Sequence, residues 1–406
     1  MNFGNTFIAF RNRNYKLYFW GRAVSQFGTA MQRTAVVWII YTLTNSAYMI
    51  GVTIFAELFP FFLLSVFGGI AADRYSRYKL VNLTQIVSMV QSVLLALLII
   101  SGHQVVWEIL TLSVLLGIVN SFDVPARQAM MNDVLDDKSN LANALSLNSS
   151  MASFGKLMGP VVAGIVLEKF GAGICFILNA ASFAFVILAL WFMKNLPPFT
   201  PQKKKQKVLK DLADGFSYLW KVPSIGIVIL VLSIECMFVI PYDTLLPVFA
   251  KDIFKGNAAT YGYLTGFIAA GAIIGSVFLA TVRTINLRLN LVFGMFLLSI
   301  GLMVFSHLDN FYLAMFFAVV CGFGTAAQNT ITNIIVQSET EAYMRGRAIS
   351  IMLMAMFGIL PVGSLLIGAV SQKIGAPNTI LVQGIVGLIL AIAFYRYLKR
   401  VKLRQN

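Results

Sequence analysis

Long apolar runs separated by short polar segments recur along the whole chain. A transmembrane helix needs about 20 mostly apolar residues, and twelve runs of this kind occur here. The predicted spans are residues 17–42, 47–71, 80–101, 106–127, 145–167, 173–193, 223–249, 260–283, 288–306, 311–335, 347–371 and 377–397. The sequence therefore predicts an all-α membrane protein with twelve transmembrane helices.

Residues 194–221 form the longest stretch that does not fit into hydrocarbon. They contain seven lysines against two aspartates, and three prolines in their first part. Six predicted spans precede this stretch and six follow it. We therefore predict two six-helix bundles, residues 1–193 and 222–406, joined by a basic cytoplasmic linker at residues 194–221.

Positive charge follows every second span. Arg74 and Arg77 follow the second predicted span, Arg127 the fourth and Arg283 the eighth. The opposite loops carry few lysines or arginines. Because cytoplasmic loops are enriched in these residues, the pattern predicts that both termini are cytoplasmic.

The composition also excludes a soluble globular protein. Only 12% of the residues are charged and the mean hydropathy is +0.80, whereas soluble domains carry about 25% charged residues. The net charge of +15 lies in short loops and tails, which indicates membrane topology rather than nucleic-acid binding. Three cysteines in apolar runs, with no CxxC pair, predict neither a disulfide nor a metal site. We expect no cleavable signal peptide.

The two halves show a weak internal repeat. Gly117–Asp123 matches Gly322–Gln328, and Gly159–Gly164 matches Gly363–Gly368, at an offset of 204 or 205 residues. Symmetry at half-chain spacing is typical of secondary transporters built from repeated bundles around a central site.

Ionisable side chains inside the spans are the first candidates for function, because they are costly in hydrocarbon and usually face a bundle interior. Glu57 and Glu235 lie near the middle of their spans, where an unpaired carboxyl group is expected to be protonated. They are the leading proton-coupling candidates. Asp243, between two prolines, is a third candidate that could equally belong to an outer gate.

Basic and amide side chains are the candidates for binding a substrate or serving as counter-ions. In the first span, Arg22, Gln26 and Arg33 share one helical face, which predicts a water-accessible polar stripe. Lys156 and Gln328 complete the set. The basic members slightly favour an anionic ligand. The alternative is that these charges form permanent ion pairs, including one between a first-span arginine and Glu57.

Residues 69–79, GIAADRYSRYK, end the second predicted span. They resemble the GxxxDRxGRR loop signature of the major facilitator superfamily, with Ser76 in place of the second glycine. The resemblance implies a latch between the two halves on the cytoplasmic side. Its members would be Gly69, Asp73, Arg74, Arg77 and Asp123.

Residues 155–164, GKLMGPVVAG, match the superfamily's GxxxGPxx(A/G)G pattern, which is associated with exporters that work as antiporters. The pattern implies a hinge or packing role for Gly155, Gly159, Pro160 and Gly164, because glycines permit close helix packing and proline bends a helix. Packing alone would also explain these residues.

Residues 10–15, 122–128, 142–149 and 241–250 are similar to the branch containing the enterobactin exporter and macrolide-efflux-type proteins. The resemblance implies the major facilitator fold and a monomeric, cofactor-free proton antiporter of the bacterial inner membrane. It would export a siderophore-like molecule or a hydrophobic drug. One departure is Ser113, which stands where drug-exporting relatives often carry an arginine.

Other functions stay open at this point. They are efflux of drugs or macrolides only, import of a siderophore or metabolite, and a non-transporting membrane sensor or scaffold. The sensor would not need carboxyl groups at mid-depth. An enzyme is disfavoured, because His103 and His307 stand alone in short loops and no HExxH, GxSxG or nucleotide-binding loop occurs.

Overall fold

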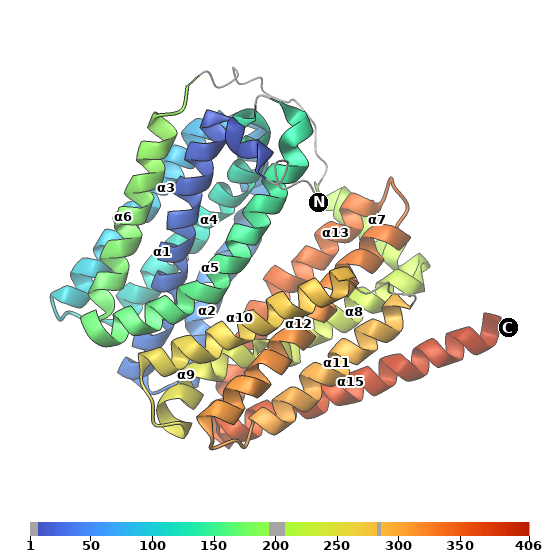
Figure 1. Cartoon of the computed structure of the whole chain (residues 1–406). Helices are drawn as coiled ribbons and strands as arrows, with labels where there is room; N and C mark the ends of the chain where they lie inside the picture. Colours follow the sequence, from blue (N-terminus) through green and yellow to red (C-terminus); the bar gives the residue numbers. More distant parts are fainter. Residues whose placement is uncertain (1–6, 136, 195–207, 282–285, 406) are drawn as a thin grey trace. The chain divides into compact units, whose positions relative to one another are not determined.

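The computed structural model describes residues 7–135, 137–194, 208–281 and 286–405. Within these ranges the chain is helical and contains no strand (Figure 1). The chain folds into two compact units, residues 1–43 with 56–204 and residues 44–55 with 205–406. Residues 195–207 of the predicted linker and Arg283 lie outside the described residues.

The helices follow one another with short connections. Those of the first half are α1 (Arg13–Thr44), α2 (Ala47–Arg74), α3 (Arg77–Ile100), α4 (Val106–Val134), α5 (Leu141–Phe170) and α6 (Ala172–Trp191). Those of the second half are α7 (Val208–Lys221), α8 (Pro223–Phe238), α9 (Leu246–Val248), α10 (Ala258–Thr281), α11 (Leu287–Phe305), α12 (Phe311–Glu339), α13 (Arg345–Met354), α14 (Leu360–Ile374) and α15 (Ala376–Gln405).

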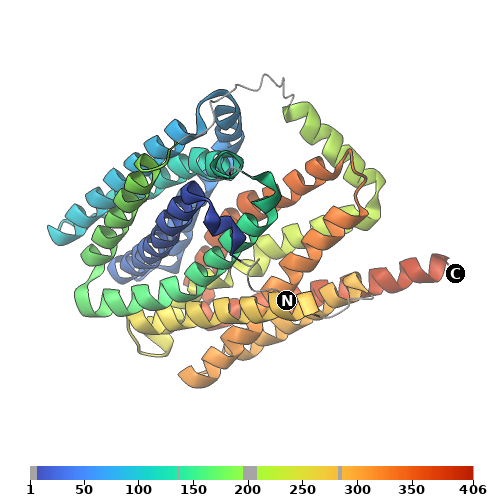
Figure 2. The same ribbon diagram turned by 45° about the horizontal axis from the view of Figure 1, so that its top comes forward.

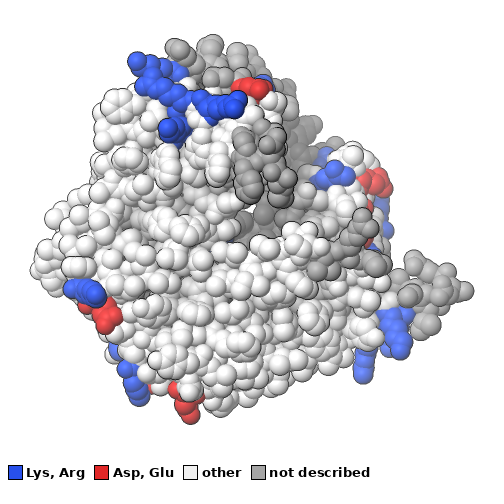
Figure 3. All heavy atoms as spheres, in the orientation of Figure 1, with Lys and Arg blue, Asp and Glu red and all other residues white. Residues whose placement is uncertain are grey.

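Eleven helical segments of the described chain are long and apolar enough to cross a membrane. The one predicted span outside these eleven is the first, residues 17–42; it corresponds to α1, which has 32 residues but is more polar because it carries Arg22, Gln26 and Arg33. In each unit, the charged side chains on the face shown in Figure 3 gather towards helix ends and leave the middle uncharged. This arrangement confirms the predicted all-α, multi-pass membrane protein.

The first turns of α2 belong to the second compact unit, although they lie in the first half of the sequence. Gly51 of α2 lies against the backbone of Ser364 in α14, and Gly368 of α14 lies against the backbone of Ala47. These glycines let the two helix backbones approach closely. The division predicted at residue 193 therefore differs from the two compact units in this segment.

The seventh and eleventh spans are interrupted, whereas α5 continues through Pro160. α8 ends at Phe238, and a 3₁₀ segment (Ile240–Leu245), α9 and a π-helical segment (Phe249–Ile253) complete the seventh span. Proline at 241 has no N–H to continue the helix. In the eleventh span, π-helical Ala355–Ile359 separates α13 from α14. Interruptions of this kind often occur at functional sites.

Each unit repeats the same helix packing. α3 lies against α4 and α6 in the first unit, and α11 lies against α12 and α15 in the second (Figures 1 and 2). Gly117 of α4 packs directly against the backbone carbonyl oxygen of Glu57 in α2, where a Cβ atom would not fit. Its counterpart Gly322 seats α12 on the carbonyl oxygen of Ile268 in α10. The glycine repeat in the sequence thus corresponds to a repeated close contact between helices.

The repeat extends to two tight turns. Gly171 joins α5 to α6 with φ of +81°, and Gly375 joins α14 to α15 with φ of +82°. Glycine adopts such positive φ angles without the steric cost that a Cβ atom imposes. The two turns lie at the same 204-residue offset as the helix glycines.

Candidate functional site

Arg33 on α1 and Glu57 on α2 form an ion pair in the first unit. Nε of Arg33 lies 3.1 Å and 3.3 Å from the two carboxylate oxygens of Glu57, and a terminal guanidinium nitrogen contacts the same carboxylate. The Glu57 side chain is 13% exposed, but the Arg33 side chain is 56% exposed. The two predicted residues therefore meet, and much of the arginine remains accessible.

Two glycines of the predicted hinge motif hold α5 against the polar face of α1. A Cβ atom on Gly155 would lie 2.6 Å from Cγ of Gln26, and one on Gly159 would overlap Cβ of Ala30. Because Ala30 is one turn before Arg33, this contact fixes the helix that carries the predicted polar stripe. Gly159, Pro160 and Gly164 are buried. Close packing against α1 thus explains Gly155 and Gly159, and a hinge role for the motif stays a prediction.

Lys156 follows Gly155 directly and is exposed on α5. It forms no ion pair with any described residue. Arg33 and Lys156, which both lie inside predicted spans, are therefore accessible cations of the first unit, and Glu57 offsets the charge of Arg33. Ionisable residues inside membrane spans are functional candidates by default.

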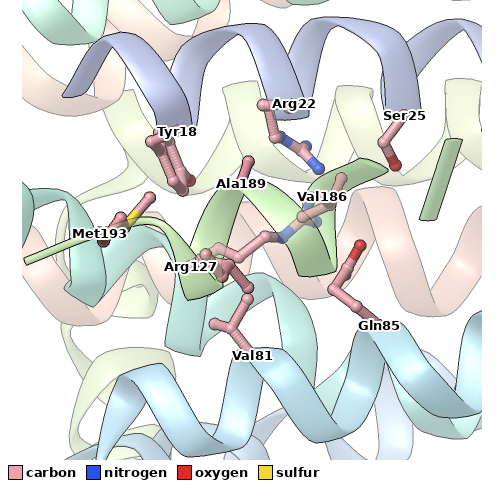
Figure 4. A pocket seen from close by; sticks show the side chains of 11 residues that line it. Tyr18, Arg22, Ser25, Val81, Gln85, Arg127, Val186, Ala189 and Met193 are labelled. Atoms are coloured by element: carbon pink, nitrogen blue, oxygen red, sulfur yellow. The ribbon is translucent and has the colours of Figure 1, made fainter. Parts of the chain in front are cut away.

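Arg22 and Asp123 belong to a second polar cluster of the first unit. Arg22 of α1, Arg127 of α4 and Gln85 of α3 line a small cavity between these helices (Figure 4). Asp123 is 3% exposed and lies 2.6 Å from Nε of Arg127. Gln85 and Thr84 also donate hydrogen bonds to Asp123, at 2.9 Å and 2.8 Å. Its carboxylate is thus held by partners from α3 and α4.

The other predicted latch residues do not pair with Asp123. Arg77, at the start of α3, lies 2.8 Å from Asp133 near the end of α4. Asp73 and Arg74 form no ion pair within the described chain, and no other atom lies within 4 Å of a Cβ placed on Gly69. A latch between the two halves stays a prediction.

The Arg77–Asp133 pair has a counterpart in the second unit. Arg288, at the start of α11, pairs with Glu339 at the end of α12. In both units an arginine of the third span is tied to an acid at the end of the fourth, so the corresponding helix ends are joined in the same way. The sequence did not reveal the acidic partners, because both lie in polar segments beyond the predicted spans.

These pairs give a testable difference in stability. The side chains of Arg77 and Asp133 are 17% and 29% exposed, and those of Arg288 and Glu339 are 32% and 31% exposed. Because solvent screens exposed pairs, we expect a double-mutant cycle with Arg77→Gln and Asp133→Asn to yield about 1 kcal/mol of coupling. The cycle with Arg288→Gln and Glu339→Gln should yield less. Unfolding of the detergent-solubilised protein measures both, and equal couplings would contradict the ranking.

A third polar cluster consists of uncharged side chains. The Oε1 atom of Gln32 accepts hydrogen bonds from Ser92 and Asn179, both at 2.8 Å, and its Nε2 atom donates to Gln91 at 3.0 Å. These residues join α1, α3 and α6, and each is at most 2% exposed. The pattern of ionisable residues in the sequence does not indicate this network. Its signal in the sequence was the recurrence of Gln, Asn and Ser in the third and sixth predicted spans, which carry no acidic or basic residue.

Glu235 lies in the second unit, one turn before α8 ends at Phe238. Its side chain is 2% exposed and has no hydrogen-bond or ion-pair partner among the described residues. Neighbouring Leu232 and Cys236 belong to an apolar cluster of α7, α8, α12 and α13. An isolated carboxylate is costly in such surroundings, whereas a neutral carboxyl group is tolerated.

Other buried polar groups of the second unit also lack partners in the part of the chain that is described. They include both amide atoms of Gln328 on α12 and the hydroxyl groups of Thr244 and Ser364. Gln383 donates a hydrogen bond to the carbonyl oxygen of Val239, at 3.2 Å, where the seventh span is interrupted. Buried polar groups usually have hydrogen-bond partners. These groups of the second unit are therefore able to form further hydrogen bonds, for example with a ligand or water.

Asp243 is exposed and lies in the 3₁₀ segment that follows the interruption. Its neighbours Tyr242 and Thr244 are buried, at 4% and 1% exposure. Glu235 and Asp243 therefore differ in environment although they belong to the same span. The buried residue is the stronger candidate for a proton site.

Comparison with known proteins agrees with this architecture. The family model described as transmembrane secretion effector matches residues 4–405. The staphyloferrin A transporter of Staphylococcus aureus is 28% identical over 394 residues, which are 96% of this chain and 95% of that protein. Macrolide efflux protein A of Streptococcus pyogenes is 21% identical over 391 residues, or 93% of this chain and 95% of the relative.

A solved structure of a POT family transporter, in complex with 5-aminolevulinic acid, has the same fold. Its TM-score is 0.76 at 11% identity, and the match covers 95% of this chain and 96% of the other. The predicted major facilitator fold and the resemblance to efflux-type proteins are therefore confirmed, and the protein is a multi-pass transporter of small molecules. The chain belongs to the transmembrane secretion effector family of the major facilitator superfamily.

Proposed function

We propose that the protein exports a small anionic molecule of the siderophore class across the bacterial inner membrane, in exchange for protons. Glu235 is the single observation that carries the proton-coupled part. A carboxyl group that is 2% exposed and unpartnered in the described chain can be ionised only when water or a cation reaches it. This condition links its protonation to the state of the transporter.

The charge of the first unit supports an anionic substrate. Arg33 and Lys156 are accessible in membrane-spanning helices, and Glu57 offsets only one of them. An arginine that keeps much of its surface exposed can bind a carboxylate or a phenolate through charge-assisted hydrogen bonds. The likeness to a staphyloferrin A transporter supports a siderophore as this anion.

The proposed cycle needs one conformational change and one exchange of protons. The interruptions of the seventh and eleventh spans give the second unit points at which a helix can bend. When Glu235 is exposed to the outer side it takes up a proton, and when it is exposed to the cytoplasm it releases that proton. After the proton is released, burying the unpaired carboxylate again would cost free energy. This cost is avoided when the second unit changes state and the carboxylate takes up a new proton on the outer side.

Everted membrane vesicles test this proposal. Vesicles containing the protein are loaded by an imposed pH gradient in the presence of staphyloferrin A, and empty-vector vesicles serve as the control. We expect accumulation that collapses when the gradient is dissipated. Accumulation that ignores the gradient would contradict proton coupling, and the absence of any ligand movement would favour a sensor.

Efflux of a hydrophobic drug is the second candidate function. It is supported by the likeness to macrolide efflux protein A over nearly the whole chain. A macrolide added to the same vesicles distinguishes the two substrates. Transport of the macrolide without transport of the siderophore would replace the anionic substrate with a drug.

Arg33 gives a specific prediction for substrate binding. Arg33→Gln should raise the KM for the anionic substrate about tenfold or more, since a hydrogen bond to a charged group contributes about 1.5–3 kcal/mol. Arg33→Lys should recover part of this loss because it keeps the charge. Initial rates in vesicles measure the effect. The control is transport of a macrolide, for which the variant should have an unchanged KM. An unchanged KM for the anion would remove Arg33 from the binding site.

A further inference from the structure

The amphipathic helix α7 precedes the seventh span and packs on the second unit. Gly215 lies against the side chains of Ile351 and Arg347 in α13, and Leu219 is 7% exposed. Asp214 lies 3.4 Å from Arg347, and the hydroxyl group of Tyr218 accepts a hydrogen bond from the backbone of Glu341 at 3.3 Å. One face of α7 is thus fixed to the start of the eleventh span and to the turn before it.

The apolar face of α7 is wider than the bundle covers. Phe216 and Trp220 lie one turn apart on the edge next to the buried face, and they are 50% and 89% exposed. Ser217 and Lys221 are exposed farther round the helix, on its polar side. An apolar edge beside a polar edge is the pattern of a helix that lies in a membrane interface.

The position of α7 in the chain supports the same environment. Only Val222 separates it from α8, and Gly226 of α8 packs on the backbone of Leu219. Because α8 spans the membrane, α7 lies at the boundary between hydrocarbon and water. Tryptophan and other aromatic side chains are enriched at this depth, where a ring contacts both layers.

Charge points to the kind of lipid. Residues 194–221 contain seven lysines and two aspartates in sequence, and the charge of Asp214 is offset by Arg347. Among the described residues of α7, Lys221 follows Trp220 directly and is exposed. Lysines beside an interfacial helix attract anionic headgroups. We propose that the Phe216–Trp220 edge of α7 lies in the headgroup layer of the bilayer and that Lys221 binds anionic phospholipid.

Site-directed fluorescence tests this proposal on the full-length protein. The native cysteines at 175, 236 and 321 are at most 1% exposed, so a new surface cysteine can be labelled selectively. Trp220→Cys and the matched control Ser217→Cys are labelled with bimane and reconstituted into phosphatidylcholine vesicles with or without phosphatidylglycerol. Phe216→Cys replaces the first variant if that variant elutes as an aggregate.

Quenching by brominated phospholipids distinguishes the possible surroundings. We expect the label at 220 to be quenched several times more than the label at 217, and more strongly when phosphatidylglycerol is present. Lys221→Gln should remove this dependence on phosphatidylglycerol. Equal quenching at the two positions, or no quenching at either, would overturn the proposal. The proposal would also be overturned if a second copy of the protein covered the label at position 220 in detergent. Quenching independent of phosphatidylglycerol would overturn the choice of anionic lipid.

Discussion

Gly68→Ala should strongly destabilise the folded protein. A Cβ atom at this position would overlap the carbonyl oxygen of Ser121 and lie 2.7 Å from its carbonyl carbon. Both atoms belong to the backbone of α4, so no side chain can rotate away. Overpacking of a close contact typically costs about 1–3 kcal/mol and more where the backbone must move. We therefore expect a loss of about 3 kcal/mol, seen as a lower melting temperature and a smaller monodisperse fraction.

The next residue provides a matched control. A Cβ atom on Gly69 would meet nothing within 4 Å, so Gly69→Ala should leave the helix contact intact. The added methyl group should even favour the helix by up to about 1 kcal/mol. Size-exclusion chromatography of both variants, made in parallel, compares them directly. Equal behaviour of the two variants would show that the contact between α2 and α4 is looser than the structure indicates.

The helices could be predicted because the membrane imposes a simple length and polarity rule. Each predicted span has a counterpart in the structure, including α1, which Arg22, Gln26 and Arg33 make too polar for a hydropathy criterion alone. The interruption at Pro241 does not follow from the presence of a proline, since Pro160 lies in a continuous helix. A proline can interrupt a span where another group takes the place of the lost helical hydrogen bonds. Here the side-chain amide of Gln383 donates a hydrogen bond to the carbonyl oxygen of Val239.

The candidate site was predictable only as a set of residues. Sequence shows that Arg33 and Glu57 lie within spans, but their meeting depends on the rotation of α1 against α2. The partner of Arg77 was missed for the same reason, because the register of α3 against α4 places Asp133 beside it. The helix α7 was missed for a different reason: its apolar face was hidden within a stretch rich in lysine and proline, which was interpreted as a linker.

Glu235→Gln should uncouple transport from the proton gradient without preventing folding. Glutamine has nearly the shape of a protonated glutamic acid, and no described residue forms an ion pair with Glu235 that the change would break. For one proton exchanged per substrate, a difference of one pH unit is worth about 1.4 kcal/mol and sustains about a tenfold accumulation. The variant should lose this accumulation in everted vesicles while it retains downhill exchange.

A second neutralisation shows whether the effect is specific to this position. Glu57 is paired with Arg33, so Glu57→Gln should alter the KM for an anionic substrate and preserve the response to the pH gradient. If Glu235→Gln still accumulates substrate tenfold per pH unit, Glu235 has no part in coupling, because a glutamine side chain cannot carry the proton. If Glu57→Gln loses accumulation instead, coupling resides in the first unit, and the ion pair with Arg33 is the group that opens during each cycle.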